Sequence, residues 1–188
     1  MFGILKGKTI AILATDGFEE AELAEPKKAL GKAGAKVHVI APQSGEIRGW
    51  NHTDWGRKAK VDRELNVASF EDYDALFLPG GVMNPDKLRT DANAVAFVKN
   101  FFNSAKPVAA ICHAPWLLIE SGAVQGRTLT SWPSLKTDLQ NAGATWVDEP
   151  VVVSGNLITS RKPDDLPIFI KTMIEQFAGT GHLAAKTA

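Results

Sequence analysis

The stretch Pro-Val-Ala-Ala-Ile-Cys-His-Ala-Pro, residues 107–115, lies at the centre of the predicted fold. Residues 107–111 are a short apolar run typical of a buried strand, and residues 113–120 carry apolar side chains at helical spacing. Cys112, the only cysteine in the chain, is therefore predicted at a strand-to-helix corner. Because the N-terminal end of a helix favours the thiolate form of a cysteine, this corner is a candidate position for a nucleophile.

The composition predicts one domain and no charged macromolecular partner. The 188 residues are 45% hydrophobic, enough for a single core, which we expect over residues 8–178 with a flexible tail at 179–188. Lys plus Arg equal Asp plus Glu at 21 each, so we expect no binding to nucleic acid or to a membrane. A single cysteine agrees with a reducing compartment, and no secretory signal opens the chain. We therefore expect a cytoplasmic protein.

The pattern along the chain predicts alternating strands and helices. Continuous apolar runs predict buried parallel strands, and helical periodicity or capping residues predict the helices between them. The expected strands are 9–14, 36–41, 74–78, 107–111 and 128–130, with a hairpin at 151–159. The expected helices start near 16–19, 91, 113, 134 and 163, and residues 42–65 are expected to make hairpin-like excursions. This order predicts an α/β three-layer sandwich with a mostly parallel central sheet.

Candidate reactive groups converge at the carboxyl ends of these strands, where such sheets bind ligands. Cys112 is either a nucleophile or a small buried hydrophobe. His113 could serve it as general base, but needs an outside group to turn its ring toward the sulfur, and is otherwise an ordinary helix-start residue. Gly80 and Gly81 could donate backbone N–H groups to an oxyanion or simply end a strand. Glu19 could be a buried, protonated hydrogen-bond donor to the sulfur or a solvated first-turn residue.

Other signals carry less information. The chain has no glycine-rich nucleotide-binding motif, so no cofactor is expected. His52 and Asp54 alone make a poor metal site, and no metal is expected. The sequence leaves the roles of His52, Asp54, Trp55 and Arg161 open. The glutaminase half of an amidotransferase would need a histidine downstream of the nucleophile and close to a glutamate. Only His182, in the predicted tail, follows His113, so we do not expect this function.

Residues 109–115, Ala-Ala-Ile-Cys-His-Ala-Pro, resemble the ThiJ/PfpI family, particularly its branch of PfpI-type intracellular proteases, deglycases and stress proteins. Further similar segments follow in the family's order and cover most of residues 9–177. They are Phe-Glu-Glu-Ala-Glu-Leu at 18–23, Asp-Ala-Leu-Phe-Leu-Pro-Gly-Gly at 74–81, Gly-Arg-Thr-Leu-Thr-Ser-Trp-Pro at 126–133 and Thr-Ser-Arg-Lys-Pro-Asp-Asp-Leu at 159–166.

The resemblance implies a flavodoxin-like sandwich of the class I glutamine amidotransferase type. It implies Cys112 as nucleophile on a strained elbow, Glu19 as the protonated partner of the sulfur, and Gly81 with the neighbouring backbone as oxyanion donors. It also implies a homodimer or higher homo-oligomer in which Asp86 of a second subunit orients His113.

The function that the resemblance implies is a stress-related cysteine hydrolase, either a peptidase or amidase, or a deglycase of glyoxal- and methylglyoxal-modified proteins. Its substrate would be a peptide, a glycated protein or a small carbonyl compound. The alternatives are a non-hydrolytic redox sensor or chaperone-like stress protein whose Cys112 is oxidised, and a cofactor-independent glyoxalase.

Overall fold

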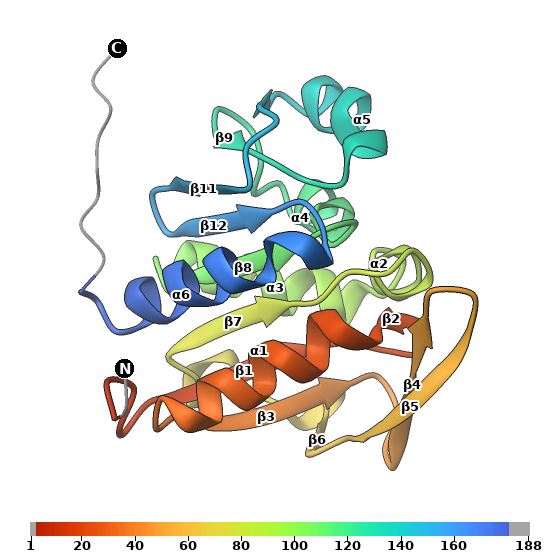
Figure 1. Cartoon of the computed structure of the whole chain (residues 1–188), viewed down its shortest axis with the longest axis vertical. Coiled ribbons are helices and arrows are strands. Elements are labelled where there is room, and N and C mark those ends of the chain that lie inside the picture. The colour runs from red at the N-terminus through yellow and green to blue at the C-terminus, as the bar shows by residue number, and fades with distance from the viewer. Residues whose placement is uncertain (1–2, 181–188) are drawn as a thin grey trace.

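The computed structural model describes residues 3–180, and its centre is a seven-stranded sheet (Figure 1). In spatial order the strands are β11 (Val151–Ser154), β12 (Leu157–Ser160), β8 (Val108–Ile111), β7 (Ala75–Leu78), β1 (Thr9–Leu13), β3 (Lys36–Ala41) and β6 (Arg63–Glu64). Every neighbouring pair is parallel except the β11–β12 hairpin. The predicted mostly parallel sheet with one late hairpin is confirmed.

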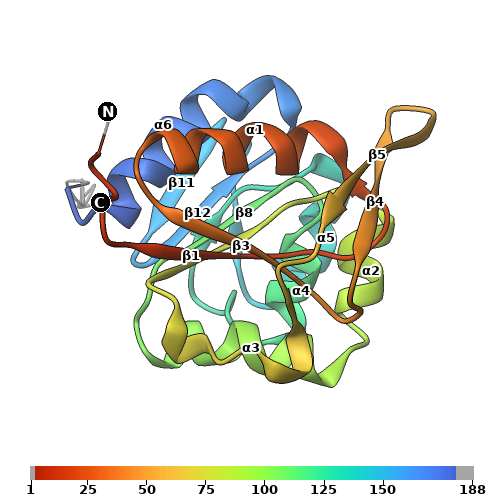
Figure 2. The ribbon, with the colours of Figure 1, turned by 90° about the horizontal axis from the view of Figure 1, so that it is seen from below.

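Helices cover both faces of this sheet, which gives the predicted three layers (Figure 2). One face packs against α1 (Glu20–Lys32) and α6 (Leu166–Phe177), and the other against α3 (Ala92–Asn103) and α4 (Pro115–Glu120). The shorter elements are α2 (Met83–Leu88), α5 (Lys136–Asn141), the 3₁₀ turns η1 (Leu65–Val67), η2 (Phe70–Asp72), η3 (Pro133–Leu135) and η4 (Pro163–Asp165), and the paired strands β9 (Thr128–Leu129) and β10 (Thr145–Trp146).

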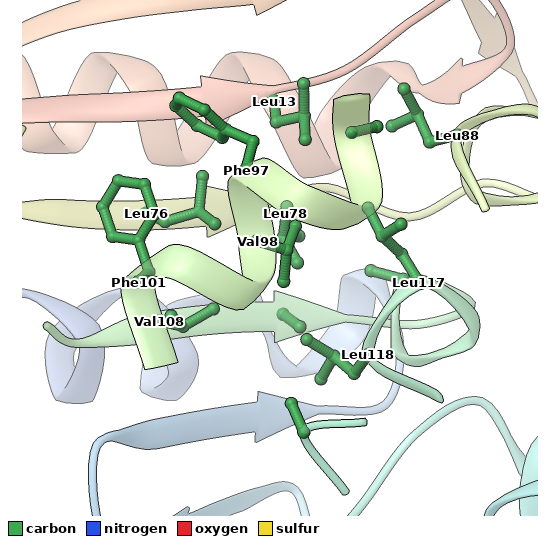
Figure 3. Packing of buried hydrophobic residues seen from close by; sticks show 14 of the residues in the cluster. Leu13, Leu76, Leu78, Leu88, Phe97, Val98, Phe101, Val108, Leu117 and Leu118 are labelled. Carbon is green, nitrogen blue, oxygen red and sulfur yellow. The ribbon is translucent and has the colours of Figure 1, made fainter. Parts of the chain in front are cut away.

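Two apolar clusters, one on each face of the sheet, hold the layers together. Figure 3 shows the cluster beneath α3, where Phe97 and Phe101 lie over strand residues such as Leu76. The rings of Phe97 and Phe101 are 5.3 Å apart, and Phe101 is fully buried. Burying each such side chain contributes roughly 1.5–3 kcal/mol, so these contacts fix the sheet whose carboxyl edge carries the site.

Several local predictions, namely a helix cap, a hairpin turn and a hairpin, are confirmed in the structure. The Asp91 side chain caps α3 by accepting from the backbone N–H groups of Asn93 and Ala94. Gly155 adopts a φ of +60° in the turn between β11 and β12. The predicted excursions at residues 42–65 contain a hairpin, β4 (Glu46–Asn51) and β5 (Asp54–Lys60).

Four helix starts differ from prediction. The helices expected from Ser134 and Pro163 begin at Lys136 and Leu166, because the 3₁₀ turns η3 and η4 come first. The helix after Cys112 begins at Pro115 rather than His113, because residues 112–114 form the turn. The first helix begins at Glu20, because residues 18–19 form a short strand, β2 (Phe18–Glu19), that pairs with β4. Asp16 therefore does not cap that helix, and instead accepts from the backbone N–H of Arg48 at 2.7 Å.

The tail predicted at 179–188 falls mostly outside the described residues, which end at 180. Within residues 3–180, none of the helices combines the length and the apolar character needed to cross a bilayer.

Candidate active site

The strand-to-helix corner at Cys112 is held in an unusual backbone conformation. Cys112 has a φ of +63°, a region that non-glycine residues rarely occupy. Its backbone N–H donates to the Ser160 carbonyl at 3.1 Å, and its carbonyl accepts from the Trp132 N–H at 2.9 Å. These bonds to neighbouring segments maintain the strained turn, a feature that concentrates at functional sites. The turn directs the sulfur away from β8 and into a pocket.

This pocket, of about 590 Å³, lies at the carboxyl ends of the strands, where ligands of such sheets bind. Cys112 is 7% exposed, so its sulfur is reached only through the pocket. The lining residues are Gly17, Glu19, Glu22, Trp50, His52, Gly81, Val82, Met83, Cys112, His113, Trp132, Lys162, Pro163 and Asp164.

The carboxyl group that contacts the sulfur belongs to Glu22, not to Glu19. Glu22 is completely buried in the first turn of α1 and lies beside Cys112, and its Oε1 has no hydrogen-bond partner within residues 3–180. Its Oε2 accepts from the Gly80 N–H at 3.0 Å. Glu19 also lines the pocket, but its place in β2 directs it toward the pocket wall at Trp50. The position predicted for Glu19, beside the sulfur, is therefore occupied by Glu22.

Burial sets the protonation state of this pair. Desolvation raises the pKa of Glu22 to about 8, so its carboxyl group is mainly protonated at neutral pH and can donate to the sulfur. Burial also raises the pKa of the Cys112 thiol, and a charged Glu22 would raise it further. The direction is opposite to the lowering expected from the sequence, because burial outweighs the Gly81 and His113 backbone N–H groups that lower the pKa of the thiol. The resting thiol therefore needs a base.

His113 is the base within reach. Its Nδ1 lies 3.2 Å from the Cys112 sulfur. Burial lowers the pKa of His113 to about 4, so the imidazole is neutral and can accept a proton. The ring stacks on Trp132 at 5.8 Å between centroids and meets the edge of Trp116 at 5.2 Å. These two rings hold the imidazole, although neither supplies a charge that would stabilise its protonated form.

The backbone N–H groups of Gly80 and Gly81 have different partners in the structure. The Gly80 N–H is already bound by Glu22 and is not free for an oxyanion. The backbone N–H groups of Gly81 and His113 lower the pKa of the Cys112 thiol, so these two donors are the candidates for an oxyanion formed beside the sulfur. Gly81 has a φ of +79°, and a Cβ at this position would lie 2.7 Å from the Glu19 backbone nitrogen. Glycine is therefore required at 81.

Asn84, which the sequence pattern did not single out, holds this turn in place. It is buried, accepts from the Thr15 N–H at 2.7 Å and donates to the carbonyls of Pro79 and Gly80 at 2.9 and 3.2 Å. One amide thus links the end of β1 to the end of β7. Its position five residues after the proline of a strand-ending Pro-Gly-Gly turn was the available signal.

Asp86 does not join the site within one chain. It lies exposed on α2, outside the pocket, and its side chain has no contact with His113. The group predicted to orient the imidazole is thus not supplied by the described part of the chain itself. Asp86 as the partner subunit's contribution stays a prediction.

The residues whose roles were open have separate positions. His52 lines the pocket, whereas Trp55 packs edge-on against Trp50 at 5.5 Å outside it. Arg161, which follows β12, forms ion pairs with Asp165 of η4 and with Asp148 in the loop before β11. Within residues 3–180 no group of three or more His, Cys, Asp or Glu side chains is arranged to hold a metal ion.

The fold and the site together define a class: an α/β sandwich with a thiol on a strained strand-to-helix elbow, beside a histidine and a protonated carboxyl group. The family model of the DJ-1/PfpI family matches residues 8–176. The chain therefore belongs to the DJ-1/PfpI family, which confirms the resemblance seen in the sequence.

Similar proteins span nearly the same length. General stress protein 18 of Bacillus subtilis is 44% identical over 165 residues, covering 87% of this chain and 94% of that protein. Protein/nucleic acid deglycase 2 of Escherichia coli is 43% identical over 167 residues, covering 86% and 93%. The crystal structure of Drosophila melanogaster DJ-1beta superimposes with a TM-score of 0.83 at 31% identity, covering 92% of this chain and 91% of that one.

Proposed function

We propose that this protein is a cysteine-dependent hydrolase that acts at an electrophilic carbon of a glycated or amide-bonded substrate, with Cys112 as nucleophile. The observation that carries the proposal is the geometry of Cys112, which lies on a strained turn at the base of the pocket with His113 Nδ1 3.2 Å from its sulfur. The deglycase and stress-protein names of relatives at about 43–44% identity support it.

For an amide, including the lactoyl amide that is the isomer of a methylglyoxal–amine adduct, the first half of the reaction uses groups already in place. The sulfur forms a bond to the electrophilic carbon while the thiol proton passes to His113 Nδ1. The electron pair of the carbonyl moves onto its oxygen, which accepts from the Gly81 and His113 backbone N–H groups. The Glu22 carboxyl group is mainly protonated at neutral pH, and its O–H would donate to the thiolate as it forms.

The second half releases the products. His113 returns the proton to the leaving nitrogen, the carbon–nitrogen bond breaks and an acyl-thioester remains on Cys112. A water molecule then attacks this carbon and gives a proton to His113. The carbon–sulfur bond breaks, the sulfur regains a proton from His113, and the acid leaves.

Replacing the sulfur tests this proposal. Cys112→Ala and Cys112→Ser should each lower the release of amine from methylglyoxal-modified N-acetyl-lysine or from peptide amides by at least about a thousandfold, since the nucleophile is lost. Both variants should melt near the wild-type temperature, because the side chain is small and the turn is held by backbone bonds. An undiminished rate in Cys112→Ala would rule the proposal out.

The second candidate is the redox-sensing function, in which Cys112 is oxidised without turnover. It is favoured by the backbone N–H groups of Gly81 and His113, which lower the pKa of the Cys112 thiol and would equally bind the oxygens of an oxidised sulfur. Mass spectrometry after mild peroxide treatment should then show Cys112 gaining oxygen. A thiol that stays unmodified would exclude this alternative.

A further inference from the structure

We infer that the pocket contains a binding subsite for a cationic group of the substrate, formed by the carboxylate of Glu19 and the indole of Trp50. The inference rests on the proposed function only in assigning the subsite to a substrate of Cys112. The chemistry expected of the ligand is that of a guanidinium or ammonium group carried close to the reacting carbon.

The carboxylate of Glu19 is free for a ligand. Among its neighbours in the described part of the chain, the Glu20 carboxylate bonds the backbone and side chain of Arg57 at 2.6 and 2.7 Å, and that of Glu22 bonds Gly80. No hydrogen bond or ion pair within residues 3–180 engages the Glu19 carboxylate, although it lines the pocket and is half-buried. Partial desolvation strengthens the attraction of such a carboxylate for a cation.

Trp50 lies beside this carboxylate and is held rigidly. Glu19 and Trp50 are paired residues of the parallel strands β2 and β4, so their side chains lie on the same side and both reach the pocket. The Trp50 Nε1–H donates to the His52 carbonyl at 3.0 Å. The Trp55 ring packs edge-on against the Trp50 ring, and the Arg48 guanidinium lies 5.7 Å from the centre of the Trp55 ring.

The whole hairpin is anchored to the body of the protein, which preorganises this wall. Figure 2 shows β4 and β5 extending from the sheet edge at the carboxyl ends of the strands. Asp16 bonds the backbone of Arg48, and Glu20 bonds Arg57, so each strand is tied down by a carboxylate. A fixed aromatic ring next to a free carboxylate is suited to a cation, through a charge-assisted hydrogen bond and a cation–π contact.

The other charged groups of the pocket leave this assignment intact. Lys162 and Asp164 form an ion pair with each other at 3.3 Å. Glu22 is the buried, mainly protonated partner of the sulfur, and His113 is neutral. Burial raises the pKa of Glu19, and the one neighbouring group that lowers this pKa is His52 at the hairpin tip, which therefore competes with a ligand for the carboxylate. A cationic ligand would replace this imidazole.

The test compares two ligands of similar shape, n-butylguanidinium and n-butylurea, by NMR titration of the indole N–H signals. Wild-type protein should bind the cation about tenfold more tightly than the urea. This difference in affinity is the one expected for a single charge-assisted pair at a partly exposed position. Glu19→Gln should reduce this preference to less than about twofold. Asp164→Asn, the matched change at the other pocket acid, should preserve it. Equal affinities in the wild type, or a preference that survives in Glu19→Gln, would overturn the inference.

A second variant and a kinetic readout separate this inference from the proposed function. His52→Asn, at a turn position whose φ of +54° asparagine tolerates, should strengthen binding of the cation by removing its competitor. Modification of Cys112 by a trimethylammonium-bearing methanethiosulfonate should be faster than by the neutral methyl reagent, and only the former should slow in Glu19→Gln. If Cys112 reacts with neither reagent, the nucleophile proposal fails, whereas the titration still decides the subsite.

Discussion

The carboxyl group of Glu22 is the single side chain on which the chemistry of Cys112 depends most directly. It is fully buried beside Cys112, its Oε2 accepts from the Gly80 N–H, and its Oε1 has no hydrogen-bond partner in the described part of the chain. Because its folded-state pKa of about 8 lies well above the ordinary 4.5, the folded protein holds a proton that the unfolded chain releases. Its contribution to stability is therefore complete below about pH 4.5 and is progressively lost as the pH rises toward 8.

Replacing Glu22 by glutamine should remove this pH dependence. The amide keeps an acceptor for Gly80 and a donor for the sulfur but cannot ionise, so Glu22→Gln should gain stability relative to wild type by a few kcal/mol between pH 5 and pH 9. Thermal unfolding at both pH values measures the gain, with Glu25→Gln on the exposed face of the same helix as control. A stability difference that does not change with pH would contradict the assignment.

Glu22→Gln should also change how the reaction rate depends on pH on the alkaline side. In wild type, ionisation of Glu22 above about pH 8 places a second negative charge beside the sulfur and withdraws the proton it donates, so the rate should fall there. Glu22→Gln should keep its rate through that range. An unchanged alkaline limb in the variant would show that another group controls it.

At this scale the sequence allowed Cys112, His113 and Gly81 to be predicted as neighbours, but the structure has Glu22 rather than Glu19 beside the sulfur. The short strand at residues 18–19 forms only through pairing with β4, some thirty residues later, and this pairing moves the helix start to Glu20. One local signal did indicate Glu22. It precedes Pro26 and Leu30 at spacings of four and eight residues, which places it on the buried stripe of α1.

Two structural elements, the elbow after β8 and the turn after β7, must approach closely for the site to form. A Cβ on Gly80 would lie 2.6 Å from the Cys112 Cβ, and one on Gly81 would lie 2.5 Å from the Gly17 carbonyl. Asn84 fixes the turn after β7 from behind. The distance between the nucleophile and its oxyanion donors is thus set by backbone contacts rather than by flexible side chains.

Gly81→Ala tests how much of the site depends on this approach. Its matched control is Gly122→Ala, since Gly122 has a similar φ of +72° but nothing within 4 Å of an added Cβ. The control should lose only about 1–2 kcal/mol of stability from the left-handed backbone. Gly81→Ala should lose more and should also lose activity. Equal effects of the two substitutions in unfolding and turnover assays would contradict the close-packed turn.

Elements whose formation depends on local pattern were predictable, and those created by tertiary contact were not. The apolar runs of β1, β3, β7 and β8 and the Asp91 cap of α3 are local signals. By contrast, α2 has six residues with no side-chain cap, and a helix this short is not stable by itself. It forms because Asn84 and Leu88 are buried against the body of the protein.

At the scale of the whole molecule, the arrangement around His113 is incomplete in one chain. The pKa of His113 is lowered by burial, and no carboxylate in the described part of the chain faces it to stabilise its protonated form. Asp86 is exposed on α2, near the same edge of the molecule as the pocket residues Val82 and Met83. An assembly that brings the partner's Asp86 to this imidazole would raise its pKa and make it a stronger base.

Subunit mixing decides whether the site is shared. Asp86→Asn should lower turnover and move the acid limb of activity toward pH 4, because His113 would return to its pKa in the isolated chain. If each site takes Cys112 from one chain and Asp86 from the other, Asp86→Asn and Cys112→Ala subunits should be poorly active separately. Exchanged into mixed oligomers, they should regain activity, since one site per pair then has both groups. Mixed oligomers that form, as shown by native mass spectrometry, and yet stay at the level of the separate variants would exclude a shared site.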